Sequence, residues 1–453
     1  MASAAAPLRG ALALGLALGL ALLGAGPAYA GAPPAEVAAT VQRIDLATAL
    51  RLAGVNNLDL ARVRAAQHQA QAANDAATLR FVPSLTVGET LAQRTGADQQ
   101  TSGAMLEVDK QLYRRAATVG LSVELGDAIF SKLAALQLQR AAGEDVNAER
   151  AAALLATANA YFDLVSAVAE RDIAVQSVQI SQDYQSQLER AAAIGLTNRS
   201  EALRLAVQTQ QARVALRGAE AHVRIAGARL AVVLRIDPAV VLRPAEHLAA
   251  TPLLVRLDTP LTQLIHTALR QRPELKASAA ALAAAERQRS GAKYGPLIPS
   301  IGALALYGQA RGAAGGALSP YRAVHDYAVG LSWRFGPGGL LDFSRTEAAD
   351  AQLERRQILA EQLRQGIIEQ VVSALTAAQS AQDQMQMAQR GVALAERSLE
   401  LSMQRKNFGV YAVTEVIQAQ QDFAHARSSN AEALSNYAKA QYALAAAIGR
   451  LGH

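Results

Sequence analysis

The fold is decided by a short stretch that interrupts a long helical pattern, AIGLTNRSE at residues 193–201. The stretch FGVYAVTE at residues 408–415 has the same layout: an apolar residue, glycine, an apolar residue, three variable positions, a hydroxyl residue and glutamate. The two glycines, Gly195 and Gly409, are 214 positions apart (409 − 195). A glycine followed by a hydroxyl residue is typical of a corner between two helices. The repeated corner therefore predicts two copies of one large unit.

The composition favours long helices that pack closely. Hydrophobic residues make up 51% of the 453 positions but aromatic residues only 4%, so most of the apolar content is Ala, Leu and Val. The absence of cysteine excludes disulfides, cysteine-ligated metals, thiol catalysis and a lipoprotein anchor. The formal charge of +6 comes without a long basic run containing aromatic residues, so we expect no nucleic-acid partner.

The N-terminus has the pattern of a secretory signal peptide over residues 1–30. Arg9 precedes an apolar run at 11–26, and Ala28-Tyr29-Ala30 is a cleavage pattern that would start the mature chain near Gly31. The alternative is an uncleaved membrane anchor, but the run is short for a membrane span. We identify no other stretch that is apolar enough for a transmembrane helix. Entry into a membrane would then require a β-barrel.

Proline placement predicts where long helices run. Residues 84–237 and 338–453 contain no proline, which leaves two intervals for uninterrupted helices. In the first repeat, 31–236, we predict an opening helix, strands at about 82–93 and 117–126, and a helical hairpin at about 127–235 with its corner at 194–200. Two adjacent apolar stripes along the hairpin's first helix indicate packing on both sides. Ser200 is predicted to cap the returning helix.

A proline-rich connector, 237–260, leads to the second repeat, 261–453. The same order is predicted there, with strands at about 299–310 and 326–336 and a helical hairpin at about 340–448 with its corner at 408–414. The fold class is thus mainly α with a small β part, duplicated in tandem.

Four strands cannot close a barrel, and an open sheet edge is not tolerated in lipid. The chain is therefore expected to assemble with copies of itself; two copies would give eight strands and three would give twelve. Four aromatic residues on or near the strands suit a girdle at the lipid boundary: Trp333, Phe335, Tyr307 and Tyr327. The alternative is that they fill a small soluble core.

The doubled layout resembles the TolC-like outer-membrane channel family over about residues 42–450. The resemblance is carried by Asn57-Leu58 and Arg272-Pro273-Glu274-Leu275 at helix starts, Pro83 and Pro299 before strands, the two glycine corners, and the C-terminal NYAKAQYAL at residues 436–444. Each motif is degenerate, and the specificity lies in their occurring together, twice, in order.

The resemblance implies a homotrimer with a 12-strand barrel in the outer membrane of a Gram-negative bacterium and a helical tunnel through the periplasm. The implied partners are outer-membrane lipid, a periplasmic adaptor (membrane fusion) protein and an inner-membrane transporter. The implied function is an export duct for drugs, metal ions or secreted proteins, and the sequence does not choose among them.

In such channels the corners form a closed mouth lined by acidic residues. Alignment on the second corner places Glu415 at one acidic position, Gln418 at the next in place of aspartate, and Glu201 as the counterpart of Glu415 in the first repeat. We predict that these residues form a constriction that favours cations. The alternative is that each glutamate only favours a helix N-terminus.

The apolar residues beside each corner glycine are predicted to contact the adaptor. They are Ile194, Gly195 and Leu196 in the first repeat and Phe408, Gly409 and Val410 in the second. The alternative is a local helix cap in which these residues pack on the preceding turn.

No catalytic, cofactor or metal site is expected, because the seven histidines show no ligand spacing and no phosphate-binding motif occurs. The main alternative function is an exported periplasmic coiled-coil adaptor or scaffold without a pore. An adaptor would have one helical hairpin, whereas this sequence predicts two.

Overall fold

The computed structural model describes residues 41–195, 198–245, 253–314, 317–407 and 413–451. They belong to one unit, Val41–His453. The predicted signal peptide, 1–30, lies outside the described residues.

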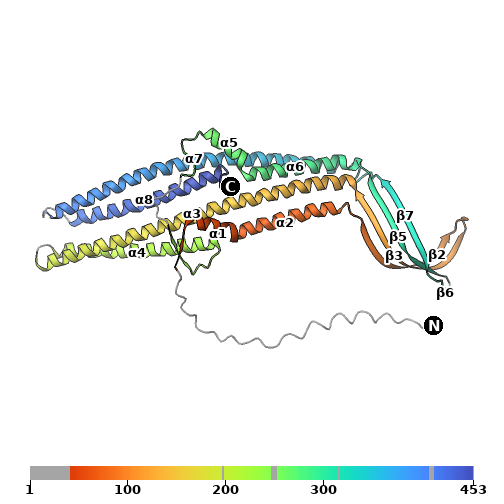
Figure 1. The fold of residues 1–453 in the computed structure, drawn as a ribbon, viewed down its shortest axis with the longest axis horizontal. Helices are drawn as coiled ribbons and strands as arrows, with labels where there is room; N and C mark the ends of the chain where they lie inside the picture. Colours follow the sequence, from red (N-terminus) through yellow and green to blue (C-terminus); the bar gives the residue numbers. More distant parts are fainter. Residues whose placement is uncertain (1–40, 196–197, 246–252, 315–316, 408–412, 452–453) are drawn as a thin grey trace, which may run out of the picture. The chain divides into compact units, whose positions relative to one another are not determined.

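The first repeat contains two helices, two strands and two long helices in that order (Figure 1). They are α1 (Leu46–Asn56), α2 (Leu58–Leu79), β2 (Ser84–Gln99), β3 (Met105–Glu124), α3 (Leu125–Ala193) and α4 (Arg199–Leu234).

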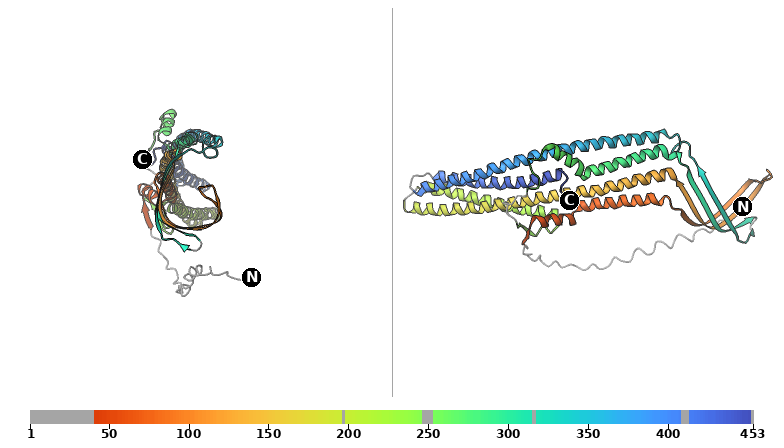
Figure 2. Two further views of the ribbon diagram at one scale, coloured as in Figure 1. Left: turned by 90° about the vertical axis from the view of Figure 1, so that its right-hand side faces the viewer. Right: turned by 45° about the horizontal axis from the view of Figure 1, so that its top comes forward.

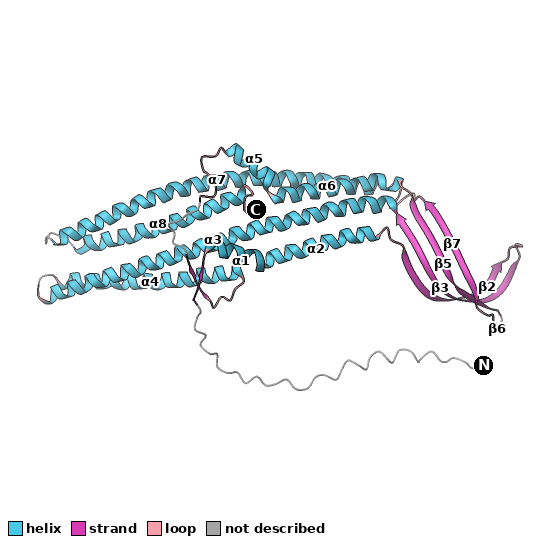
Figure 3. Ribbon diagram, in the orientation of Figure 1, coloured by secondary structure: helices cyan, strands magenta, loops and turns pink. Residues whose placement is uncertain are grey.

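The second repeat has the same order, with a 3-10 turn η1 (Gly295–Leu297) and a two-residue strand β6 (Ala317–Leu318) added. Its main elements are α5 (Leu261–Gln271), α6 (Pro273–Tyr294), β5 (Ser300–Ala314), β7 (Arg322–Ser332), α7 (Phe343–Asn407) and α8 (Val413–Ala447). The long helices and the smaller strand region are separated in Figure 3. The predicted tandem duplication and mainly helical fold class are confirmed.

The opening helix of each repeat is broken at the same place for a local reason. Asn57 is extended, and its side chain accepts hydrogen bonds from the amides of Asp59 (2.8 Å) and Leu60 (3.3 Å). In the second repeat Pro273 occupies the start of α6, where its missing amide hydrogen is not needed. One pattern that reads as a continuous helix in the sequence is therefore two helices.

A small parallel sheet lies where the sequence predicts a helix start and a connector. Strand β1 (Val41–Ile44) pairs with β4 (Val241–Pro244), in register from Val41 opposite Val241 to Ile44 opposite Pro244. Ile44 and Leu242 are buried in the same cluster as the middle of α3. The pair thus attaches both ends of the first repeat to its core.

The four long strands form one antiparallel sheet in the order β2-β3-β5-β7. The central pairing joins the two repeats, since β3 runs beside β5 from Lys110 opposite Ala314 to Glu124 opposite Ser300. The sheet is curved, as the end-on view in Figure 2 shows.

The first two strands are longer than predicted. Residues 94–116 are expected to form mostly a loop, but β2 continues to Gln99 and β3 begins at Met105, with a tight turn at Gly103 (φ +84°). In this part the face that is apolar elsewhere in the sheet carries polar residues such as Glu107 and Asp109, whereas Leu106, Val108 and Leu112 lie on the other face. The apolar pattern of the strand is therefore not continuous along one face. Backbone pairing between the strands, which extends to Gln99 opposite Met105, forms the structure instead.

The strand β7 ends before the predicted 336. It stops at Ser332, so Trp333 and Phe335 lie just beyond the strand. Phe335 makes only an isolated bridge with Leu340, in a turn where Gly336 and Gly338 have positive φ. These conformations end the strand and direct the chain into α7.

The register divides the sheet into an apolar face and a polar face. On one face Leu85, Val119, Ala305 and Tyr327 lie in one row across the four strands, and on the opposite face the neighbouring row is Thr86, Thr118, Leu306 and Asp326. The apolar face is exposed; Val87 is 75% and Val329 83% exposed. A sheet with this alternation is typical of a membrane barrel wall.

Helix α3 is the centre of the helical part. It contacts α2, α4, α6 and α8. The predicted apolar stripes are buried at Ala158, Tyr161 and Val165 on one and at Phe162 and Ile173 on the other, and their remaining residues are half-buried. One window of α3 is apolar enough to cross a membrane, contrary to our expectation from the sequence. Half of that window is buried against neighbouring helices, which accounts for its apolar residues as core packing.

The strands are joined to the helices by contacts between the repeats. Arg334 Nη2 lies 2.7 Å from Glu124 Oε1, and Arg345 Nη2 lies 2.5 Å from Asp127 Oδ1. The start of α3 also meets η1 closely, since a Cβ atom on Gly126 would lie 2.1 Å from the carbonyl oxygen of Gly295. Only glycine fits this contact.

Candidate functional site

The first corner ends α3 with a glycine in the left-handed conformation. Gly195 has a φ of +75°, its amide donates to the carbonyl of Ala192 (3.1 Å), and no atom lies near the position that a Cβ would take. Ile194 is 72% exposed. Of the predicted adaptor contacts, Ile194 and Gly195 therefore lie at the surface of the corner; Leu196, Phe408, Gly409 and Val410 lie outside the described residues.

The predicted cap of α4 is wrong by two positions. Asn198, not Ser200, precedes the helix, and its side chain accepts a hydrogen bond from the amide of Ser200 (3.2 Å). Asparagine has the short acceptor that this position requires.

Both predicted gate glutamates lie in the first turn of a helix, Glu201 in α4 and Glu415 in α8. Each is half-buried. The residue after Glu415, Val416, is buried in a cluster with Tyr184, Leu188 and Leu205, which joins the start of α8 to both helices of the first hairpin. Glu415 is thus held in place by its neighbour rather than placed on a free loop.

Gln418 is exposed one turn further along α8. Its amide nitrogen donates to the carboxylate of Asp422 (2.9 Å). Position 418 lacks the aspartate expected from the family resemblance, but the carboxylate of Asp422 lies one helical turn later. Its placement on the same helix face follows from the i, i+4 spacing.

Polar side chains join the two hairpins along the seam between α8 and the first hairpin. Gln421 donates to Gln208 (2.7 Å), and Arg427 donates to Gln176. Further from the corners Ser435 donates to the carbonyl of Phe162 (3.1 Å), and Lys439 pairs with Asp163. These partners are more than 200 positions apart, so no local pattern predicts them.

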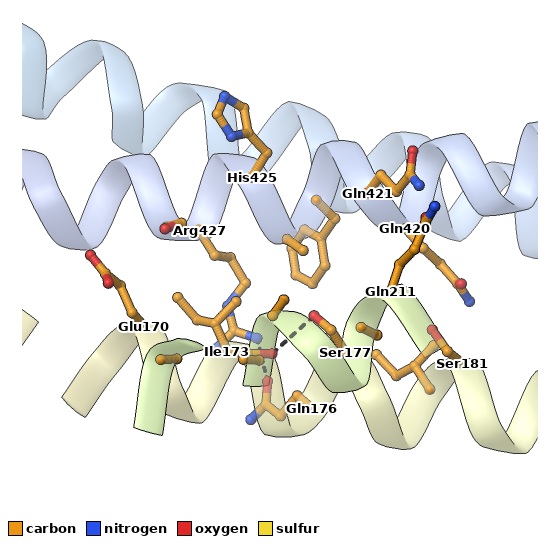
Figure 4. A pocket seen from close by; sticks show the side chains of 18 of the residues that line it. Glu170, Ile173, Gln176, Ser177, Ser181, Gln211, Gln420, Gln421, His425 and Arg427 are labelled. Carbon is orange, nitrogen blue, oxygen red and sulfur yellow. Dashed lines mark hydrogen bonds between the residues drawn. The ribbon is translucent and has the colours of Figure 1, made fainter. Parts of the chain in front are cut away.

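A cavity of about 540 Å³ lies in this seam, between α3, α4 and α8 (Figure 4). Apolar side chains such as Ile173 and Phe423 form part of its wall, and Arg427 lies across Phe423 with its guanidinium 5.6 Å from the ring centre. At one end His222 Nδ1 is 3.9 Å from Glu170 Oε2. No pattern in the sequence predicts this cavity.

An apolar stripe on α4 lies beside the same corner. Leu203 (63% exposed), Val207 (59%) and Val214 (73%) recur at spacings of four and seven, which is the pattern of a coiled-coil seam. Because these three side chains are more than half exposed, no helix of the described chain covers the stripe. It is therefore a surface on which another helix can pack.

The four predicted interface aromatics are all exposed. Tyr307 (68%) and Tyr327 (77%) lie on the apolar face of the sheet, in adjacent rows. Trp333 (50%) and Phe335 (71%) lie at the helical end of β7, where the indole nitrogen of Trp333 donates to the carbonyl of Leu297 (3.3 Å). In the described residues none of the four fills a buried core.

Comparison with protein families gives a match over residues 264–450 to the family described as outer membrane efflux protein. A direct comparison with curated protein sequences gave no match.

Comparison with solved structures shows the same fold in outer-membrane channels. The Campylobacter jejuni CmeC outer membrane channel is similar with a TM-score of 0.76 and 16% identity, over 89% of this chain and 85% of that one. The Vibrio cholerae outer membrane protein VceC gives a TM-score of 0.74 and 17% identity, over 90% and 97%. The Neisseria gonorrhoeae MtrE channel in its open state gives 0.72 and 18%, over 90% of each chain.

Proposed function

We propose that this chain is a TolC-like outer membrane efflux protein and that it forms an export duct together with a periplasmic adaptor and an inner-membrane pump. The family match of residues 264–450 carries the proposal. The fold agrees with it along the whole described chain, since a sheet with one apolar face continues into helices of 69 and 65 residues. Such helices are about 100 Å long, far more than a bilayer needs.

The alternative of a periplasmic adaptor without a pore is not favoured. An adaptor has no use for four strands that form a sheet with an exposed apolar face. This chain has that sheet and two long helical hairpins.

The duct is a homotrimer in this proposal. Among the described strands, β2 and β7 each pair on one side only, so their outer edges need partners in lipid. Three copies of four strands give a closed 12-strand barrel. The apolar stripe of Leu203, Val207 and Val214 supports the same assembly, because a helix of the next copy would cover it and close the tunnel.

The adaptor is proposed to contact the two corners. Ile194 supports this, since it is a large apolar side chain exposed beside Gly195. The cavity in the seam lies on the same helices and would allow the hairpins to shift against each other when the mouth opens.

The gate is proposed to be an acidic constriction formed by Glu415 and Glu201, with Gln418 and Asp422 one and two turns further along α8. Three copies of a carboxylate around a narrow pore attract cations and repel anions. The alternative, that Glu415 only stabilises the start of α8, predicts a loss of local helix stability and no change in ion selectivity.

The gate is tested by recording single channels of the Glu415→Ala variant in planar bilayers. We expect the ratio of cation to anion permeability to fall by at least twofold, with conductance rising if the carboxylates also hold the mouth closed. Glu432→Ala, which removes an exposed carboxylate further along α8, is the matched control and should leave the ratio unchanged. Equal ratios in the two variants would show that Glu415 is only a helix-terminal charge.

The export function is tested in a deletion strain. The full-length chain should fractionate with the outer membrane and restore export only when its adaptor and pump are present. Recovery of the protein as a soluble periplasmic species would contradict the proposal.

A further inference from the structure

The apolar face of the sheet ends in two rows of charged and aromatic residues, and the proposed export function assigns no role to them. Along β3 this face presents Val123, Leu121, Val119 and Ala117 at alternate positions, and then Arg115 and Tyr113. The partners in these last two rows are Glu89 and Gln309 beside Arg115, and Leu91 and Arg311 beside Tyr113.

The side chains in these rows form one connected cluster. The guanidinium of Arg311 lies 4.9 Å from the ring centre of Tyr113 and 4.6 Å from that of Tyr321. The guanidinium of Arg115 lies 5.4 Å from the same Tyr321 ring, and its Nε is 2.8 Å from Glu89 Oε1. Two arginines thus share one tyrosine ring, which holds both guanidiniums on the same face of the sheet.

The cluster has an excess of positive charge that nothing in it neutralises. Glu89 balances Arg115, whereas Arg311 has no carboxylate partner among the described residues, and its enclosed Nε has no hydrogen-bond acceptor there. The next acidic group on this face, Asp109, is two rows further from the apolar band and accepts from Gln93 (3.4 Å). The positive charge of Arg311 therefore favours an anion at this place.

The position of the cluster indicates where that anion lies. Tyr113 is ten residues from Val123 along β3 (123 − 113), which is about 34 Å at about 3.4 Å per residue. With the strand tilt of about 40° that barrels have, the height is about 26 Å, close to the ~25 Å apolar band of an outer-membrane barrel. The cluster therefore lies at the lipid boundary farthest from the helices, where tyrosine rings are also favoured.

We propose that Arg115 and Arg311, framed by Tyr113 and Tyr321, bind the phosphate of an outer-leaflet lipid whose acyl chains lie on the apolar rows below. Arginine suits this ligand because its planar fork donates two parallel hydrogen bonds to a phosphate. Val87 and Tyr307 form the last apolar row before Arg115 and would contact the first part of the acyl chains. This inference rests on the outer-membrane location in the proposed function.

The test measures lipid bound to the purified full-length oligomer by native mass spectrometry. The probes are lipid A with two phosphates, the same lipid with one phosphate, a zwitterionic phospholipid and inorganic phosphate. We expect the wild type to retain bisphosphorylated lipid A best, and Arg115→Gln and Arg311→Gln each to lower its apparent affinity by about fivefold. Arg311→Lys should recover part of the loss, because it keeps the charge but not the fork.

Arg114→Gln is the matched control. Arg114 is the neighbour of Arg115 but lies on the opposite face of the sheet, between Thr90 and Ala310, and its loss should leave lipid binding unchanged. Equal effects of Arg114→Gln and Arg115→Gln, or displacement of lipid A by millimolar inorganic phosphate, would overturn the proposal of a lipid site.

If the proposed export function itself is wrong, the result is different, because the wild-type chain would not be found in the outer membrane at all. Failure of the lipid inference alone would leave a correctly located oligomer that binds all the probes equally.

Discussion

At the scale of single residues, glycine positions are decided by close contacts that the sequence does not show. Gly126 and Gly143 both lie in α3, and nothing in their neighbours distinguishes them. The structure places Gly126 against the carbonyl of Gly295, whereas a Cβ on Gly143 would meet only the side chain of Gln67, at 3.6 Å. The first glycine is required by the fold and the second is not.

We therefore expect Gly126→Ala to destabilise the protein and Gly143→Ala to leave it unchanged or more stable. Overpacking against backbone costs about 1–3 kcal/mol, and alanine in an open helix site gains about 0.5–1 kcal/mol over glycine. The measurement is the midpoint of thermal helix loss in detergent, followed by circular dichroism. Equal midpoints for the two variants would contradict the close contact between α3 and η1.

Asp342 is a second residue whose role depends on geometry. Its carboxylate accepts from the hydroxyl of Ser344 (2.7 Å) and from the amides of Gly338 (2.7 Å) and Arg345 (3.1 Å), between the end of β7 and the start of α7. These hydrogen bonds, with that of Ser344 the largest cause, hold the pKa of Asp342 below its usual value. A carboxyl with a lowered folded-state pKa adds stability above its unfolded-state pKa and loses it as the pH falls through the folded-state pKa.

The Asp342→Asn variant should accordingly melt below the wild type at pH 7, and the difference should shrink as the pH falls below about 4, the ordinary pKa of an aspartate. Melting curves at several pH values check this. The control is Asp383→Asn, an exposed residue within α7, for which no such convergence is expected. A difference that stayed constant down to pH 3 would show that the carboxylate is not the stabilising form.

At the scale of elements, the sheet shows why strand positions were predicted better than strand lengths. The alternation of Leu85, Val87 and Val119 with small or polar residues indicates the strands where one face is apolar. Beyond the charged row the apolar face becomes polar, and the apolar residues of β3 (Leu106, Val108 and Leu112) lie on the other face, yet β2 and β3 remain paired to Gln99 and Met105. Pairing between strands is a tertiary interaction, and its extent cannot be read from one strand.

The two faces of the sheet should respond differently to a charge. Leu85→Arg puts a guanidinium near the middle of the apolar band, which costs about 2–4 kcal/mol in a barrel wall. Thr86→Arg puts the same group one position later on the opposite, polar face. We expect the first variant to lower the amount of oligomer in the outer membrane several-fold and the second to have little effect, as measured by fractionation and blotting.

If both variants inserted equally well, the apolar face would not contact lipid. In that case Tyr307 and Tyr327, which lie on the same face, would not lie at the membrane boundary either. This comparison tests the strand register, which assigns each residue to one face of the sheet, and not the exposure of either tyrosine.

At the scale of the whole molecule, the edges of the sheet require partner strands but do not fix the number of copies. Four strands per chain allow eight strands from two copies or twelve from three. The chain has a mass of 47.5 kDa before any signal peptide is removed. We expect light scattering in detergent, corrected for the detergent, to give a protein mass close to three times that of the mature chain.

A mass of two chains would contradict the trimer but not the barrel. A mass of one chain would contradict both, because the unpaired edges of β2 and β7 would then face lipid. The stripe of Leu203, Val207 and Val214 gives a second measure: substitution of Val207 by glutamate should weaken the oligomer only if helices of neighbouring copies meet there.

The sequence alone predicts the duplication and the order of elements. It does so because the corners, the proline-free intervals and the apolar stripes of α3 are local patterns, and local patterns persist in the folded chain. The gate stays a prediction, since Glu201 and Glu415 are assigned to it by the family resemblance at the two corners.

Contacts between residues far apart in the sequence are seen only in the folded chain. The pairing of β3 with β5, the contact of Gly126 with Gly295, the cavity between the hairpins and the sharing of Tyr321 by Arg115 and Arg311 each join residues far apart in the chain. No periodicity encodes such contacts, because they arise only when separate elements bury or pair their surfaces together.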